Sequence, residues 1–230
     1  MLDAPVRRAL APALDRVGAA LADAGVPPLA LTATGFAAGL AACVAVTRHA
    51  WSVALVLWLV NRLLDGLDGA TARRRGATDL GGFLDIVADF TVYAGFVLAV
   101  GVAVPEARIA CLALLTAYYV SGTAFLALSS LLERRGSPGV AADRRSLRFV
   151  GGLAEGTETV IVYVLFCLLP QRAEVIAWLF TAAVAVTVLQ RVALGVHLLS
   201  PPAPGAVAAP TRTAPPVDRR TRVRPLEETS

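Results

Sequence analysis

Apolar stretches of membrane-crossing length constrain this chain more than any other feature. Six of them cover residues 28–47, 51–72, 81–104, 107–132, 153–169 and 173–199. A helix that crosses a bilayer needs about 20 mostly apolar residues, so we expect each stretch to form a transmembrane helix. Charged or proline-containing segments separate the stretches. The sequence therefore predicts an all-α integral membrane protein with six transmembrane helices.

The composition excludes several other classes of protein. Hydrophobic residues make up 57% of the 230 residues and charged residues only 17%, whereas a soluble domain carries about 25% charged residues. Three cysteines inside apolar stretches cannot form a disulfide framework. All 21 basic residues are arginine, and this total gives no reason to expect a nucleic-acid partner. We expect a multi-pass protein of the cell membrane, that is, the inner or plasma membrane.

The segments that flank the apolar stretches predict three regions. Residues 1–25 carry apolar side chains at helical spacing, namely Val6, Leu10, Leu14, Val17 and Leu21. This pattern predicts an amphipathic helix in the plane of the lipid headgroups, an interfacial helix. Residues 26–200 are expected to form the membrane domain, which is the catalytic domain. Residues 201–230, rich in proline and arginine, predict a disordered tail.

The distribution of arginine predicts the orientation of the chain in the membrane. Loops on the cytoplasmic side carry an excess of basic residues. If the N-terminus is cytoplasmic, only Arg48, Arg108 and Arg172 of the loop arginines face outward. We therefore expect both termini to be cytoplasmic.

Four carboxylates at two neighbouring helix ends need an explanation, because an acid within a span costs about 2.5–3.5 kcal/mol. Asp65 and Asp68 close the second stretch, and Asp85 and Asp89 open the third. The members of each pair are three or four residues apart and share one face of a helix. A short turn joins the two helices on the predicted cytoplasmic side. The four carboxylates can therefore converge on one point.

Converging carboxylates in a medium of low dielectric repel one another and take up protons unless a positive charge holds them ionised. A divalent cation would supply that charge. Ligands that are all oxygen suit magnesium, manganese or calcium rather than zinc, and magnesium completes its shell with water and substrate phosphate. Two metal ions bridged by shared carboxylates are the arrangement for phosphoryl chemistry. The sequence thus indicates a phosphate-bearing substrate.

Residues beside the acids fit the same interpretation. Gly69 and Gly81 allow a substrate or a facing backbone to approach closely, although simple helix packing explains each of them equally well. Arg73 is suited to hold a phosphate, whereas Arg74 and Arg75 serve as a topology signal. Asn61 and Arg62 are expected to be buried near the acids. Arg62 either offsets the acidic cluster or extends toward the interface.

The complete pattern resembles the signature of the CDP-alcohol phosphotransferase (CDP-alcohol phosphatidyltransferase) family. Seven residues separate its two halves, Asp65-x-x-Asp68-Gly69-x-x-Ala72-Arg73 and Gly81-x-x-x-Asp85-x-x-x-Asp89. All eight fixed positions match, and the order of one interfacial helix and six spans is also that of the family. The stretch from Gly151 to Thr159 is similar to a small, poorly characterised bacterial branch.

The resemblance implies a role for each matching residue. Asp65, Asp68 and Asp85 would bind metal, a pair of Mg²⁺ or Mn²⁺ ions, while Asp89 would be the general base and touch the second metal. The CDP pocket would be shaped by Gly69, Ala72, Arg73 and Gly81, with Thr32 of the first span approaching the nucleotide. The implied reaction is metal-dependent phosphatidyl transfer from a CDP-alcohol, with CDP-diacylglycerol as the expected donor, to a hydroxyl of a small polar alcohol. CMP is released, and the product enters phospholipid biosynthesis. A homodimer is expected only from this resemblance.

The acceptor site has weaker signals. A phosphate on the acceptor could dock on Arg144, Arg145 and Arg148, although a topology signal explains these arginines at least as well. Glu155 and Glu158 are three residues apart at the start of the fifth span and could face the metal cavity.

Other functions remain open at this stage. Intramembrane acids also mark the pathways of ion-coupled transporters, but the aspartate cluster has no second copy in a repeated half. An intramembrane prenyltransferase would need two separated acidic motifs. A CDP-headgroup transferase acting on a lipid alcohol would use the same acids.

Overall fold

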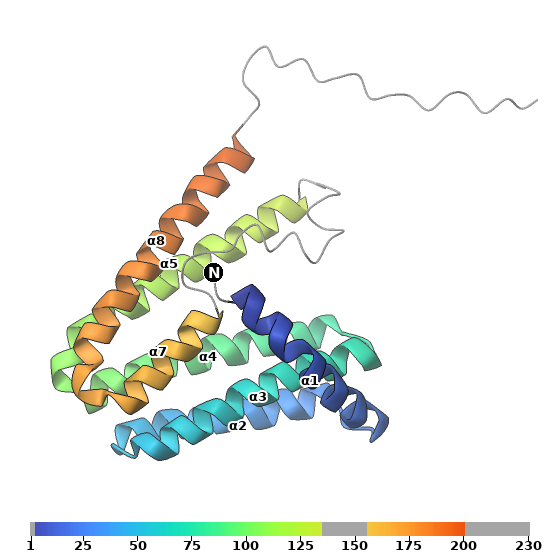
Figure 1. Cartoon of the computed structure of the whole chain (residues 1–230). Helices are drawn as coiled ribbons and strands as arrows, with labels where there is room; N and C mark the ends of the chain where they lie inside the picture. The colour runs from blue at the N-terminus through green and yellow to red at the C-terminus, as the bar shows by residue number, and fades with distance from the viewer. Residues whose placement is uncertain (1–2, 135–155, 201–230) are drawn as a thin grey trace, which may run out of the picture. The chain divides into compact units, whose positions relative to one another are not determined.

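The described part of the chain, residues 3–134 and 156–200 of a computed structural model, is helical and contains no strand (Figure 1). Its elements in chain order are α1 (Asp3–Asp23), α2 (Pro28–Thr47), α3 (Trp51–Arg75), α4 (Asp79–Ala103), η1 (Pro105–Ala107), α5 (Arg108–Arg134), α7 (Gly156–Leu168), η3 (Pro170–Arg172) and α8 (Ala173–Leu199). The prediction of an all-α membrane protein is confirmed, and α2 has the predicted bounds.

Helix signals in the sequence place the ends of α3 and α4 next to each other. Arg73, Arg74 and Arg75 occupy the last turn of α3, where positive charge stabilises the helix dipole. Gly76 then leaves the helix with a φ of 100°, which favours glycine. The side chain of Thr78 caps α4 by accepting a hydrogen bond of 3.1 Å from the backbone N–H of Gly81. The acid-bearing ends of the two helices are therefore joined by a tight turn.

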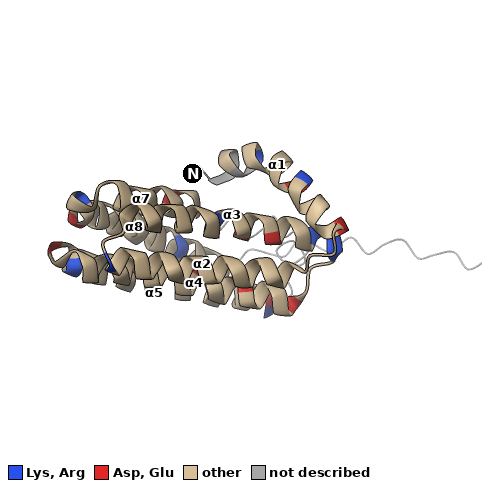
Figure 2. Ribbon diagram, turned by 90° about the horizontal axis from the view of Figure 1, so that it is seen from below, with Lys and Arg blue, Asp and Glu red and all other residues tan. Residues whose placement is uncertain are grey.

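Helix α2 packs against both α3 and α4, α1 packs against α3, α5 against α4, and α7 against α3. Figure 2 shows that charged residues lie mainly near the helix ends and that most of each ribbon is uncharged. Four of the described helical segments are long and apolar enough to cross a membrane: Pro28–Thr47, Asp79–Ala103, Pro105–Arg134 and Pro170–Leu199. Helix α3 carries the polar residues of the acidic motif, and α7 has only 13 described residues. The protein is thus a multi-pass membrane protein.

An aromatic cluster fills the centre of the helix packing. The ring of Tyr163 stacks on Phe96 at 4.7 Å between centroids and lies 4.8 Å from Trp58. Its hydroxyl donates a hydrogen bond of 2.8 Å to the backbone carbonyl of Tyr93. All three of these packed rings are fully buried. This cluster ties α3, α4 and α7 together beneath the acidic motif.

Helix α1 lies along α3 through small residues. A Cβ added at Gly18 would come within 2.6 Å of Cβ of Ala70, and the side chain of Leu14 covers Gly66. Three residues of the predicted apolar stripe, Val6, Leu10 and Val17, remain exposed. Helix α1 thus packs on the membrane domain and keeps an apolar face, and its interfacial position stays a prediction.

Small residues also allow α2 to approach α3 and α4 closely. A Cβ added at Gly39 would lie 2.6 Å from a γ-carbon of the buried Val92 and 3.0 Å from Nδ2 of Asn61. We predict that Gly39→Ala lowers the free energy of unfolding by about 1–3 kcal/mol, because neither neighbour can move away freely. Thermal unfolding in detergent measures this effect. Gly82→Ala is the matched control, since no atom lies within 4 Å of its added Cβ, and equal unfolding temperatures for the two variants would contradict the prediction.

Candidate active site

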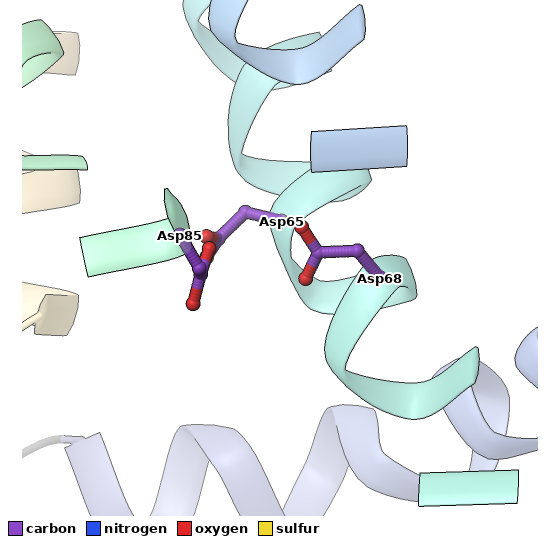
Figure 3. A group of neighbouring side chains, drawn as sticks. All are labelled: Asp65, Asp68 and Asp85. Atoms are coloured by element: carbon purple, nitrogen blue, oxygen red, sulfur yellow. The ribbon is translucent and has the colours of Figure 1, made fainter. Parts of the chain in front are cut away.

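Three carboxylates from two helices converge at the joined ends of α3 and α4. Asp65, Asp68 and Asp85 each offer one oxygen, and these oxygens all lie within 4.8 Å of one another. Figure 3 shows the side chains of Asp65 and Asp68 leaving α3, with the carboxylate of Asp65 beside that of Asp85 from α4. Asp68 is buried, and the other two are half-buried. The spacing of three residues on α3 thus places both of its acids toward the facing helix.

A small cavity lies at this cluster. It is lined by Thr32, Gly35, Phe36, Asn61, Asp65, Asp68, Asp85, Ala88 and Asp89. The cavity has a volume of about 10 Å³, which is about the room that one water molecule needs. Helix α2 therefore forms a third wall of this cavity, beside the acids of α3 and α4.

The fourth acid is arranged differently. Oδ1 of Asp89 accepts a short hydrogen bond of 2.6 Å from Nη2 of Arg62, and Oδ2 lies 3.4 Å from Nη1. The same Nη1 is 3.5 Å from Oδ2 of Asp65. Asp89 lines the cavity with the other acids, but its carboxylate is engaged by a guanidinium. Arg62 therefore offsets the acidic cluster, which decides between the two interpretations of this residue.

Arg62 is held inside the helix packing on several sides. Its Nε donates to Oδ1 of Asn61 at 2.8 Å, and its Nη1 donates to the hydroxyl of Tyr93 at 2.7 Å. The guanidinium carbon lies 4.9 Å from the ring centre of Trp58 and 5.0 Å from that of Tyr93, within the range of cation–π attraction. The side chain is 11% exposed.

The first span contributes one polar contact to the acids. Oγ1 of Thr32 donates a hydrogen bond of 2.8 Å to Oδ2 of Asp68. Asn61, also expected near the acids, is buried and donates through Nδ2 to the carbonyl of Gly35 at 2.8 Å. The short motif that singled out Thr32 thus lies at the cavity, while its contact with a nucleotide stays a prediction.

The other residues of the predicted CDP pocket border the cluster without lining its cavity. Gly69 follows Asp68 in α3, and Ala72 is half-buried one turn further on. Arg73 is exposed and forms an ion pair of 2.9 Å with Asp15 of α1. Gly81 lies against the cap of α4, with an added Cβ 3.0 Å from Oγ1 of Thr78. Their predicted contacts with CDP remain predictions.

Four of the five predicted acceptor residues cannot be compared with the structure. Arg144, Arg145, Arg148 and Glu155 lie outside the described residues. Glu158 is half-buried in the first turn of α7.

The sequence analysis did not single out Arg191, a half-buried arginine of α8. Arg191 of α8 donates through Nη1 to Oγ of Ser121 at 2.7 Å and to its backbone carbonyl at 3.1 Å. Its guanidinium carbon lies 5.3 Å from the ring centre of Phe125. Its position as a charged residue inside the last apolar stretch is a sequence signal that could have identified it.

The donor set of the cluster fits a hard divalent cation. Asp65, Asp68 and Asp85 offer oxygen ligands alone, as Mg²⁺ and Mn²⁺ prefer. Their separation allows one ion to contact all three. Asp65 and Asp85 are half-buried, so the cluster is partly exposed on their side.

Comparison with known proteins supports the family that the aspartate signature indicates. The sequence profile of the CDP-alcohol phosphatidyltransferase family matches residues 26–189. The chain is 42% identical over 198 residues to the inner membrane protein YnjF of Escherichia coli (strain K12), covering 84% of this chain and 94% of that protein.

A solved structure shares the fold. The crystal structure of Mycobacterium tuberculosis phosphatidylinositol phosphate synthase (PgsA1) with CDP-DAG bound matches with a TM-score of 0.64 and 22% identity, and the match covers 85% of this chain and 98% of that chain. The eight-position aspartate signature lies on α3 and α4 within the segment that the family profile spans. The chain therefore belongs to the CDP-alcohol phosphatidyltransferase family, a class of transferases that act in phospholipid biosynthesis.

Proposed function

We propose that this protein transfers the phosphatidyl group of CDP-diacylglycerol to the hydroxyl of a small polar alcohol and releases CMP. The observation that carries the proposal is the convergence of three carboxylates, whose oxygens lie within 4.8 Å of one another, with Asp89 lining the same cavity. Family membership supports the reaction type. CDP-DAG bound to PgsA1, a protein of the same fold, supports the donor.

Asp65, Asp68 and Asp85 would hold the metal, Mg²⁺ or Mn²⁺, and a second ion would share these acids with Asp89. When bound, the metal supplies positive charge that stabilises the diphosphate and the departing CMP. The cluster itself arranges the ligands in advance, since Thr32 fixes Asp68 through its hydroxyl. Gly69, Ala72, Arg73, Gly81 and Thr32 would contact the CDP portion of the donor.

Asp89 would act on the acceptor alcohol. Its carboxylate accepts the hydroxyl proton while the alcohol oxygen forms a bond to the phosphorus on the lipid side. The bond between that phosphorus and the bridging oxygen breaks, and CMP leaves with the electron pair. The proton stays on Asp89 until it is passed to water, so the step needs no covalent enzyme intermediate and no further reactant.

The proposal also covers the orientation of the chain in the membrane, the acceptor site, the oligomeric state and the two terminal regions. The chain would cross the membrane six times with both termini and the active site on the cytoplasmic side, as the arginine distribution indicates. The acceptor would be held by Arg144, Arg145, Arg148, Glu155 and Glu158, and the enzyme would form a homodimer. Residues 1–25 would lie in the interface, and residues 201–230 would be a disordered tail.

We predict that Asp89→Asn lowers the rate constant of transfer by about 10²- to 10⁴-fold, the usual contribution of a general base. Purified protein, radiolabelled CDP-diacylglycerol and a panel of polar alcohols provide the assay, with CMP release as the readout. Asp79→Asn is the matched control, because Asp79 lies exposed in the first turn of α4 outside the cluster. Full activity of Asp89→Asn would defeat the mechanism. Transfer only from CDP-headgroup donors to diacylglycerol would instead identify the other transferase type.

Removal of divalent cations should abolish transfer, and Mg²⁺ or Mn²⁺ should restore it. The reason is that Asp65, Asp68 and Asp85 leave a concentrated negative charge that repels a diphosphate. Titration of the metal-free protein with Mn²⁺, followed by electron paramagnetic resonance, should show binding that Asp85→Asn weakens at least about tenfold. CMP release that persists in excess EDTA would contradict the metal requirement.

A further inference from the structure

Helix α1 packs on the part of α3 that carries the first half of the aspartate signature (Figure 1). A Cβ added at Gly66 would lie 3.2 Å from the side chain of Leu14, and Gly18 lies against Ala70. Both contacted positions of α3 fall within residues 65–73, the span of that half. The N-terminal helix is therefore placed beside the segment that we propose for the donor.

One polar contact joins α1 to the signature itself. Nη2 of Arg73 donates a hydrogen bond of 2.9 Å to Oδ1 of Asp15. Asp15 lies between Leu14 and Gly18, the two residues of α1 that pack on α3, so the helix packing sets the place of its carboxylate. The side chain of Arg73 is 60% exposed and that of Asp15 49%. An exposed ion pair contributes little to stability, so the main effect of this one is on where the guanidinium lies.

The other arm of that guanidinium lies over Gly69. Side chains of an α-helix lean toward its N-terminus, and Nη1 of Arg73 lies 3.6 Å from a Cβ added at Gly69, one turn back. Gly69 directly follows Asp68, whose carboxylate belongs to the cluster. A guanidinium has five N–H donors in a fixed fork. Within the described residues only Asp15 accepts a hydrogen bond from Arg73, so Nη1 keeps its donors for a ligand beside the cluster.

We propose that Asp15 is a positioning residue, which holds Nη2 of Arg73 so that Nη1 is presented to the diphosphate of the donor. This inference rests on the proposed function, in which Arg73 contacts the CDP portion. It adds a residue of the N-terminal helix, outside the aspartate signature, to the donor site. A planar guanidinium that is fixed at one arm loses less freedom when its other arm binds a ligand. Asp15 thus acts on donor binding through Arg73.

The KM for CDP-diacylglycerol tests this role. Asp15→Ala removes the carboxylate and should raise this KM about three- to fivefold, the upper range for an exposed ion pair, while the rate constant of transfer changes less. Alanine is a better helix former than aspartate, so α1 should not be weakened. Asp15→Asn keeps an oxygen that accepts from Nη2, so its KM should stay closer to that of the wild type. Asp23→Ala is the matched control, since Asp23 is an exposed acid of the same helix, and it should change neither constant.

A second measurement separates positioning from support of the fold. The dissociation constant of CDP in the presence of Mg²⁺, measured by isothermal titration calorimetry, should rise in Asp15→Ala by the same factor as the KM. In a protein that already carries Arg73→Gln, Asp15→Ala should leave both constants unchanged, because Asp15 acts only through Arg73. Asp15→Ser, which also removes the charge and shortens the side chain, replaces Asp15→Ala if that variant does not fold.

The outcomes separate this inference from the proposed function. A lower KM in Asp15→Ala would mean that Asp15 competes with the diphosphate for Arg73, and an unchanged KM would mean that the contact has no effect on the donor. An effect of Asp15→Ala that persists beside Arg73→Gln would assign Asp15 to the fold alone. Each of these three results would overturn the positioning role while the transferase assignment stands. Wild-type protein that binds CDP but releases no CMP would instead overturn the proposed function, and the CDP dissociation constants would still test Asp15.

Discussion

The structure depends on placing four carboxylates where two apolar helices meet inside a membrane protein. Each acid is costly there unless a positive charge faces it, so the surrounding residues are arranged to supply or to admit such charge. Arg62 supplies one from within, buried against Trp58 and Tyr93 and paired with Asp89. The cluster of the other three acids is the site that we propose for the second, a divalent cation from solution. Electrostatic balance thus links the packing of the protein to the chemistry of its family.

The backbone around the cluster serves this arrangement. Gly76 and the Thr78 cap turn the chain sharply between α3 and α4, which brings acids twenty residues apart in sequence to one cavity. Gly39 lets α2 come close enough to Val92 and Asn61 to form the third wall. Rigid helices rather than loops therefore carry the acids, and side chains on such elements are held more precisely than side chains on loops.

Much of this architecture could be predicted from the sequence because its signals are local. Apolar stretches of bilayer length fixed the positions of the helices to within a few residues, and spacings of three and four placed the acids on shared faces. The α3 helix continues through Arg75 rather than ending near Ala72, because its terminal arginines are good helix formers that suit a C-terminus. What spacing could not predict were contacts between distant segments. The inward direction of Arg62 and the contact of Arg191 with Ser121, 70 residues away, depend on how helices pack.

Anomalous scattering from crystals grown with Mn²⁺ tests the central claim most directly. The account predicts a strong anomalous peak among the carboxylates of Asp65, Asp68 and Asp85, about 2.0–2.6 Å from their oxygens. A manganese-loaded crystal with no peak at this cluster, or with the side chains of α3 and α4 turned away from each other, would contradict it.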